Sequence, residues 1–313
     1  MNYQSIPPKQ PGLSQFFDID LREIVPFIHW SFFFRAWRIP GKFEGIEKVS
    51  SCVSCKQSWL QNFSGSTRDK AEEALKLFQD AQNMLQQFSV EKSVQINAAV
   101  GLFSAFAQEE DIHILYENKE FIIPTLRQQH PSTDGFCYAL SDFLNVENDY
   151  IGTFATVVQG TEKLIQHFEN KKDIYSSMMV KTLADRLAEA TAEWLHYQVR
   201  TKIWNYASDE LLEIENILKN KYQGIRPAIG YPSLPDQSII FDLEPLLQLN
   251  TIGIKITENG AMYPPSSVAG LYFAHPQSKY FNVGKIDDQQ LKDYARRRGK
   301  TIEEMKKWLA ANI

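Results

Sequence analysis

The pattern of apolar positions predicts two long helices. In residues 66–89, STRDKAEEALKLFQDAQNMLQQFS, apolar side chains recur at intervals of three and four, as on one face of an amphipathic helix. Ser66 or Thr67 is expected to cap this helix. The same spacing in residues 174–207 places an apolar stripe on a second helix, formed by Leu183, Leu187, Ala190, Trp194 and Tyr197.

Strands are predicted between these helices. Residues 94–108, 111–124 and 150–158 are rich in β-branched and aromatic side chains. Two helices are expected at the end of the chain; Gly299 stops the first, and Thr301 begins the second with Glu304 at capping-box spacing. Helices mixed with short, turn-linked strands predict an α+β fold.

Composition and charge exclude several classes of partner. The 313 residues carry a net charge of -5, so a general attraction to nucleic acid or to an anionic membrane is not expected. The most apolar window, residues 24–34, is interrupted by Pro26, His29 and Ser31 and is too short to span a bilayer, so it is interpreted as core. The first residues show no secretory signal, which predicts a cytoplasmic protein.

The three cysteines do not predict a disulfide scaffold. Cys52, Cys55 and Cys137 are few and odd in number, consistent with a reducing compartment. Cys52 and Cys55 form CVSC, but a closed zinc site needs four ligands, so a buried or incidental pair is favoured over a metal site. No glycine-rich phosphate loop, GxSxG or HExxH motif is present.

Two stretches carry candidate chemistry. Asp185, Glu189 and Glu193 form a row of like charges on the second long helix, either as a solvated face or beside a cation. The segment RPAIGYP, residues 226–232, has too much proline and glycine for a regular helix or a ladder-paired strand. It is either a turn or a rigid, extended segment that a ligand can approach closely.

These stretches also carry a resemblance. LADRLAEATAEWLHYQVRTKIWNYA followed by KYQGIRPAIGYPSLPD closely resembles the activation domain of cobalamin-dependent methionine synthase. Matches such as FIHWSFFFRAW, EEDIHILY and ENGAMYPPSSVAGLYFAHPQSKYFNVGKI extend it, in order, over residues 24–310. The resemblance implies a bent antiparallel sheet flanked by several long helices, in a single domain at 21–313 after a lead-in at 1–20.

The resemblance also implies a function. The family domain binds S-adenosylmethionine and reactivates cobalamin that has reached the inactive Co(II) state, with an electron from flavodoxin. The cobalamin module's Asp-x-His-x-x-Gly motif has one near match, DIHILY at 111–116, where Tyr116 replaces the glycine, so His113 is interpreted as a strand residue. The chain is therefore expected to be a stand-alone reactivation subunit that meets cobalamin on a partner chain. It is a methyltransferase component, not active alone, with no catalytic side chain or metal of its own.

The family pattern assigns ligand contacts within RPAIGYP. Arg226 can clamp the carboxylate of S-adenosylmethionine, and the backbone of Pro227 and Ala228, with that of Ile229, can meet its adenine or amino group. Gly230 allows close approach. Tyr231 can place a ring or hydroxyl near the sulfonium.

Further contacts lie outside this segment. The family pattern assigns ligand contacts to Tyr280 and Phe281, which the residues alone would place in a strand core. Glu189 and Asp185 match residues on the side that meets the sulfonium or the cobalamin partner. His29 stands where the family typically has a ligand-contacting aspartate, which weakens attraction for a cation.

Two alternatives stay open on the sequence. One is a non-catalytic docking module for a corrinoid protein that has lost S-adenosylmethionine binding, and the other is a reactivator of a different corrinoid methyltransferase. The basic run at 296–298 either docks an acidic flavodoxin or is a solvated helix end.

Overall fold

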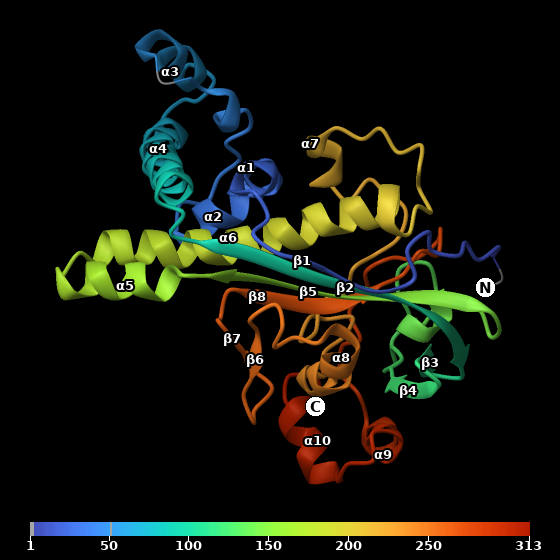
Figure 1. Ribbon diagram of the computed structural model, residues 1–313. Coiled ribbons are helices and arrows are strands. Elements are labelled where there is room, and N and C mark those ends of the chain that lie inside the picture. Colours follow the sequence, from blue (N-terminus) through green and yellow to red (C-terminus); the bar gives the residue numbers. More distant parts are fainter. Residues whose placement is uncertain (1–2, 51) are drawn as a thin grey trace.

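A bent antiparallel sheet lies between two layers of helices in the computed structural model, which describes residues 3–50 and 52–313 (Figure 1). Its strands follow the order β4-β3-β2-β5-β8, and β1 also pairs with β2. The strands are β1 Gly12–Phe16, β2 Gln95–Gln108, β3 Asp111–Tyr116, β4 Lys119–Pro124, β5 Asp149–Gln159 and β8 Ser267–Tyr272. A separate hairpin pairs β6 Lys255–Ile256 with β7 Met262–Tyr263.

The long strand β2 gives the sheet its shape. On one edge β1 pairs with the segment 98–102 of β2, and β3 then pairs with 104–108. On the other edge β5 pairs with β2 over 95–105. On that edge, the first half of β2 therefore pairs with β1, and its second half pairs with the β3–β4 hairpin.

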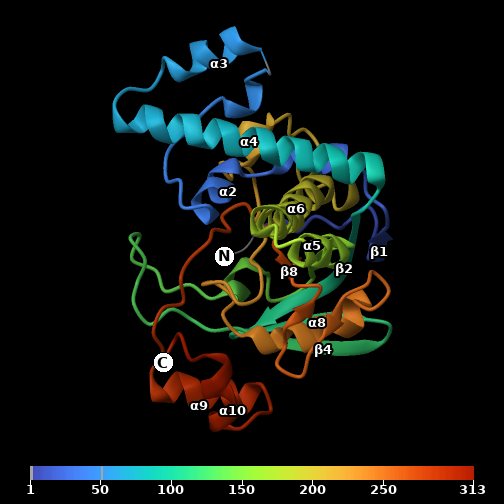
Figure 2. The same ribbon diagram turned by 90° about the vertical axis from the view of Figure 1, so that its left-hand side faces the viewer.

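The helices divide between the two faces of the sheet (Figures 1 and 2). On one side lie α1 to α7, and on the other lie α8 to α10. Their bounds are α1 Leu21–Ile24, α2 Trp30–Ala36, α3 Val53–Leu60, α4 Ser66–Glu91, α5 Thr161–Asn170, α6 Ile174–Gln198, α7 Ile214–Ile217, α8 Ile240–Leu247, α9 Asp288–Arg297 and α10 Ile302–Trp308.

Each face of the sheet has its own hydrophobic core. Val100, Leu102 and Phe154 pack with α6 and the N-terminal helices, whereas Ala155 and Leu271 pack with the C-terminal helices. Successive side chains of a strand point to opposite faces, so a sheet covered on both faces needs continuous apolar runs. This explains why residues 94–108 show no polar alternation.

The predicted helices and strands are largely confirmed. The helix expected at 66–89 is α4, but its N-cap is Gly65 and no side chain caps it, so the proposed cap at Ser66 or Thr67 is wrong. The segment 111–124 is a hairpin rather than one run. His113 is a residue of β3, as expected, and its Nδ1 lies 2.7 Å from Glu120.

The predicted boundaries of the two C-terminal helices are confirmed. Thr301 and Glu304 form the expected capping box of α10. Gly299, with a φ of 61°, follows the end of α9. The lead-in contributes to the sheet, because β1 lies within it, a strand that the sequence pattern did not predict.

The basic run at 296–298 is neither a docking patch nor a solvated helix end. Arg296 is exposed, but the side chain of Arg297 is only 10% exposed and that of Arg298 only 4%. Arg298 forms ion pairs with Asp236 and Asp242 at 3.2 and 2.5 Å. Two of the three guanidinium groups therefore hold the C-terminal helices in place.

The sequence favours a buried or incidental CVSC pair over a metal site, and of these two alternatives the buried pair is wrong. Both Cys52 and Cys55 are exposed, and their sulfur atoms form a disulfide at the start of α3. Within the described residues no cluster of histidine, cysteine and acidic side chains could hold a metal ion. Every helix in this part of the chain is too short or too polar to span a bilayer.

Candidate functional site

Helix α6 carries the acidic row from the surface into the protein. Asp185 is exposed, Glu189 is half-buried and Glu193 is buried. Asp185 accepts a hydrogen bond from Ser266 at 2.8 Å, and Glu189 accepts one from the Tyr231 hydroxyl at 2.9 Å. The row is therefore not a solvated face, because segments from outside α6 engage its carboxylates.

RPAIGYP runs extended along the outer edge of β8. The Leu271 amide donates to the Pro227 carbonyl at 3.0 Å, and the Ile229 amide donates to the Ala269 carbonyl at 2.9 Å. An isolated bridge joins Ala228 to the strand between these bonds. The extended interpretation is thus confirmed. The prediction that the segment cannot pair with a strand is wrong at these positions, where proline contributes only its carbonyl.

A glycine of β8 makes this close pairing possible. A Cβ at Gly270 would lie 2.2 Å from the Pro227 carbonyl oxygen and 2.8 Å from the Ala228 Cα, distances that real side chains do not reach. Any larger residue would push the segment off the strand. Gly270 gave no signal in the sequence, because its role depends on a segment about forty residues earlier in the chain.

The pairing also decides which backbone groups face outward. The Ile229 amide and one side of the Pro227 carbonyl are engaged by β8, so they are not free for adenine as the sequence interpretation supposed. Ala228 sits opposite Gly270 in a non-hydrogen-bonded pair, where the amide points away from the partner strand. Among Pro227, Ala228 and Ile229, only Ala228 therefore presents its N–H group away from β8.

The turn after Ile229 returns the chain toward α6. Gly230 has a φ of 81°, a backbone conformation that residues other than glycine rarely adopt. Its amide donates to the Leu234 carbonyl at 2.8 Å. Tyr231 follows with an exposed ring, and its hydroxyl donates to Glu189. The turn therefore places an aromatic ring above the acidic row.

Arg226 places a positive charge beside the acidic row and so offsets the repulsion between its like charges. Its Nη2 donates to Glu193 at 2.9 Å, and its Nη1 lies 3.9 Å from Glu189. The side chain is 16% exposed, and that of Glu193 is 7% exposed. Burial lowers the pKa of Arg226, but Glu193 and its other neighbours outweigh this and raise that pKa well above its ordinary value. The guanidinium is therefore permanently charged.

Tyr280 and Phe281 have opposite environments, although they are adjacent. The Tyr280 hydroxyl accepts a hydrogen bond from the Arg226 amide at 3.0 Å, and its side chain is exposed. The Phe281 ring is buried beside Tyr138 and Phe143. Only Tyr280 presents its side chain at the site. Phe281 packs in the core, as the residues alone predict, but neither residue lies in the strand that was expected there.

His29 lies at the N-cap of α2 on the same side of the sheet. Its Nδ1 is 2.8 Å from the Ser31 hydroxyl, and its ring meets Phe32 edge-on. Burial lowers the pKa of His29, while the nearby Glu193 carboxylate opposes this and Arg186 and Arg35 add to it. The negative charge of Glu193 therefore influences the pKa of His29, but no hydrogen bond joins His29 to the acidic row in the described structure.

A cluster of polar side chains next to the site is formed by Arg200, Glu210 and Tyr222. After Gln198, α6 continues as a π-helical turn at Val199–Ile203, which buries Arg200 completely. Arg200 pairs with Glu210 at 2.8 Å, and its guanidinium stacks 3.8 Å over the ring of Tyr222. Tyr222 lies four residues before Arg226, so this contact holds the chain just ahead of RPAIGYP.

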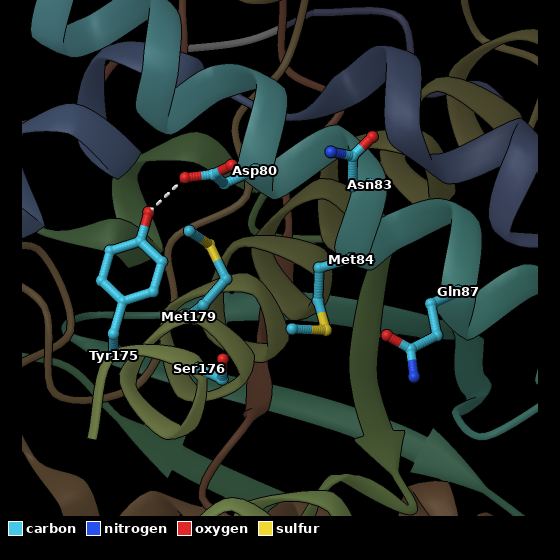
Figure 3. Close-up of a pocket in the computed structure, with 7 residues that line it drawn as sticks. All are labelled: Asp80, Asn83, Met84, Gln87, Tyr175, Ser176 and Met179. Atoms are coloured by element: carbon cyan, nitrogen blue, oxygen red, sulfur yellow. Dashed lines mark hydrogen bonds between the residues drawn. The ribbon is translucent and has the colours of Figure 1, made fainter. Parts of the chain in front are cut away.

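A groove between α4 and α6 is separate from this site (Figure 3). Its volume is about 240 Å³, and Tyr175 bridges it by donating to Asp80 at 2.7 Å. Tyr175 lies at the start of α6, roughly 27 Å along the helix axis from Glu193. None of the predicted site residues lines the groove. It is lined by Asp80, Asn83, Met84, Gln87, Tyr175, Ser176 and Met179.

The structure thus brings together Arg226, Tyr231, Tyr280 and Glu189, with His29 and Asp185 at the margins. Glu193, which the sequence interpretation did not assign to the site, is the residue closest to the Arg226 guanidinium. Its place in the acidic row was the available signal.

The fold is that of an activation-domain class of protein. The family described as "Vitamin B12 dependent methionine synthase, activation domain" matches residues 20–299. The crystal structure of the MetH reactivation domain bound to AdoHcy is similar, with a TM-score of 0.87 and 36% sequence identity, over 99% of this chain and 93% of that chain. The chain belongs to the activation-domain family of vitamin B12 dependent methionine synthase, which confirms the resemblance and the α+β fold.

Proposed function

We propose that this chain binds S-adenosylmethionine between RPAIGYP and α6, and presents its methyl group to cobalamin held on a partner chain. The observation that carries the proposal is the Arg226 segment, fixed along β8 directly over the acidic row. The similar MetH reactivation domain is bound to AdoHcy, the compound that S-adenosylmethionine becomes when it gives up its methyl group. The proposed role is reactivation of a methionine synthase.

The charges of the site suit this ligand. Glu189 and Glu193 contribute two negative charges and Arg226 one positive charge, so the three groups leave one net negative charge. S-adenosylmethionine carries a sulfonium, an ammonium and a carboxylate, which sum to one net positive charge. Because opposite charges attract strongly where water is partly excluded, the acidic row favours this cation over neutral analogues.

Individual groups match parts of the ligand. The Arg226 Nε is buried and has no hydrogen-bond partner among the described residues, so it can donate to a ligand carboxylate that enters the space beside the guanidinium. The outward amide of Ala228 can donate to an acceptor on the adenine or the carboxylate. The exposed Tyr231 ring offers a π-face to the sulfonium, and Tyr280 lies beside Arg226.

Methyl transfer from this ligand requires little acid or base chemistry. Bound S-adenosylmethionine supplies an electrophilic methyl carbon, and the work of this chain is to orient it and exclude water. The family implies a cobalamin-binding chain as partner and a flavodoxin-like electron donor. Since Arg297 and Arg298 are buried in ion pairs, the run at 296–298 does not supply the donor's docking patch.

Calorimetric titration with S-adenosylmethionine tests the proposal. Arg226→Lys keeps the positive charge beside Glu193 but removes the planar fork, so the protein should fold and bind at least tenfold more weakly. Arg296→Ala, on an exposed side chain, is the matched control and should bind like the wild type. Wild-type protein that shows no binding, with or without a cobalamin partner, would contradict the proposal.

A docking module without S-adenosylmethionine is the second candidate. One observation favours it: Glu193 already neutralises Arg226 inside the protein, which reduces what the guanidinium gains from a ligand carboxylate. The same titration separates the two candidates. If only the cobalamin partner binds, the docking module is correct, and the identity of that partner then separates methionine synthase from another corrinoid methyltransferase.

A further inference from the structure

The disulfide of α3 lies at the edge of the molecule. Cys52 is the N-cap of α3 and Cys55 lies in its first turn, and both side chains are exposed. In Figure 1, α3 lies beyond α4, on the side away from the sheet. A second protein or a small thiol can therefore reach this bond without any movement of the core.

The disulfide does little to hold α3 in place. It closes a loop within one helical turn, and short loops constrain the unfolded chain least. The helix is held instead by Trp59, which is buried, donates from Nε1 to the Glu44 carbonyl at 3.0 Å and packs against Phe63. Breaking the disulfide therefore leaves α3 docked.

We propose that Cys52 and Cys55 form a reversible dithiol–disulfide site that exchanges with thiol reductants of the glutathione or dithiol-protein class. A Cys-x-x-Cys pair has the spacing that redox sites use, and this pair is exposed, as labile disulfides are. This proposal is independent of S-adenosylmethionine binding.

The exchange balances as a two-electron step. A reductant thiolate attacks one sulfur, forms a mixed disulfide and displaces the other cysteine as a thiolate. A second reductant thiol then displaces the protein cysteine, so the protein gains two electrons and two protons and the reductant leaves as its disulfide. Oxidised reductant reverses both steps.

The geometry assigns different roles to the two sulfurs. The Cys55 amide donates to the Cys52 Sγ at 3.1 Å, and the Ser54 hydroxyl lies 3.3 Å from the same sulfur. These groups and the N-terminus of α3 stabilise negative charge on Cys52. Cys52 is therefore the leaving thiolate, and the reductant is attached to Cys55 in the mixed disulfide.

Redox titration of the whole protein tests the site. The protein is equilibrated in mixtures of reduced and oxidised glutathione, quenched with acid and alkylated. After digestion, mass spectrometry measures the mass of the peptide that contains Cys52 and Cys55. We expect it to change from disulfide to doubly alkylated as reduced glutathione increases, and to return when oxidised glutathione is added. A pair that stays oxidised in every mixture, or stays reduced in every mixture, would overturn the proposal.

Single variants test the assigned roles. Cys55→Ser leaves Cys52 free, and Cys52→Ser leaves Cys55 free while serine keeps the N-cap of α3. At neutral pH, Cys52 should be alkylated about twofold to fivefold faster than Cys55, the gain that a helix N-terminus gives an anion. Cys137 is present in both variants and serves as the internal reference. Equal rates, or a faster Cys55, would overturn the assignment.

Discussion

The guanidinium of Arg226 donates to the carboxylate of Glu193 at 2.9 Å, and this ion pair joins the RPAIGYP segment to α6. The two residues are 33 positions apart, and both side chains are largely shielded from water. Because a shielded charge is costly without a partner, each residue depends on the other. The pair is thus both a structural link and part of the proposed ligand site.

Removing one partner of this pair should destabilise the protein strongly. Arg226→Ala leaves the Glu193 carboxylate buried and unpaired, so the free energy of unfolding should fall by about 3–5 kcal/mol. Urea denaturation monitored by circular dichroism measures this change. A loss below about 1 kcal/mol would show that water reaches Glu193 freely.

The double variant Arg226→Gln with Glu193→Gln is the matched control. It replaces both charges with amides that can hydrogen-bond to each other, so its loss of stability should be smaller than that of Arg226→Ala. Its binding of S-adenosylmethionine should still be weak, because the ligand carboxylate loses its cation. The control therefore separates the contribution of Arg226 to folding from its contribution to binding.

Gly270→Ala should disturb the site without removing any of its functional groups. The added Cβ would meet the Pro227 carbonyl oxygen at 2.2 Å, so RPAIGYP must move away from β8. We expect a loss of about 1–3 kcal/mol in stability and weaker binding of S-adenosylmethionine. Denaturation and calorimetry on the same sample check both, and unchanged binding would show that the segment need not lie against β8.

His196 should make stability depend on pH. Burial lowers its pKa well below the ordinary value, and the charges of Arg200 and Arg226 lower it further. The unfolded chain therefore takes up a proton below about pH 6.5 while the folded protein does not, so this contribution to stability is present above that pH and is lost as the pH falls.

The variant His196→Gln isolates this effect. Glutamine can keep a hydrogen bond to Tyr206, whose hydroxyl lies 3.2 Å from the His196 Nε2. Between pH 7.5 and 5.5 the wild type should lose about 1.4 kcal/mol more stability than the variant. Parallel denaturation curves at the two pH values measure the difference. Equal losses in both proteins would contradict a neutral His196.

Arg298 and Arg296 should differ sharply, although they are close in sequence. Arg298→Ala leaves Asp236 buried without its cation and should cost about 3–5 kcal/mol. Arg296→Ala removes an exposed ion pair with Asp293 and should cost less than about 1 kcal/mol. Thermal and urea unfolding of the two variants compares them directly. Similar losses would contradict the burial of Arg298.

Several features of this protein follow from local sequence. The three-and-four spacing of apolar residues defines α4 and α6, because a helix face repeats at that interval whatever lies against it. The capping box of Thr301 and Glu304 involves residues only one turn apart. The composition of RPAIGYP, together with the family resemblance, also located the candidate site.

Tertiary structure decided the properties that depend on distant segments. Which of Tyr280 and Phe281 faces the site, whether Arg297 and Arg298 are exposed, and what meets Glu193 all depend on side chains far away in the chain. Gly270 acquires its role only when RPAIGYP lies on β8. Burial and ion pairing are properties of the packed molecule, so the sequence determined the elements and the candidate residues, and packing determined which of them form the site.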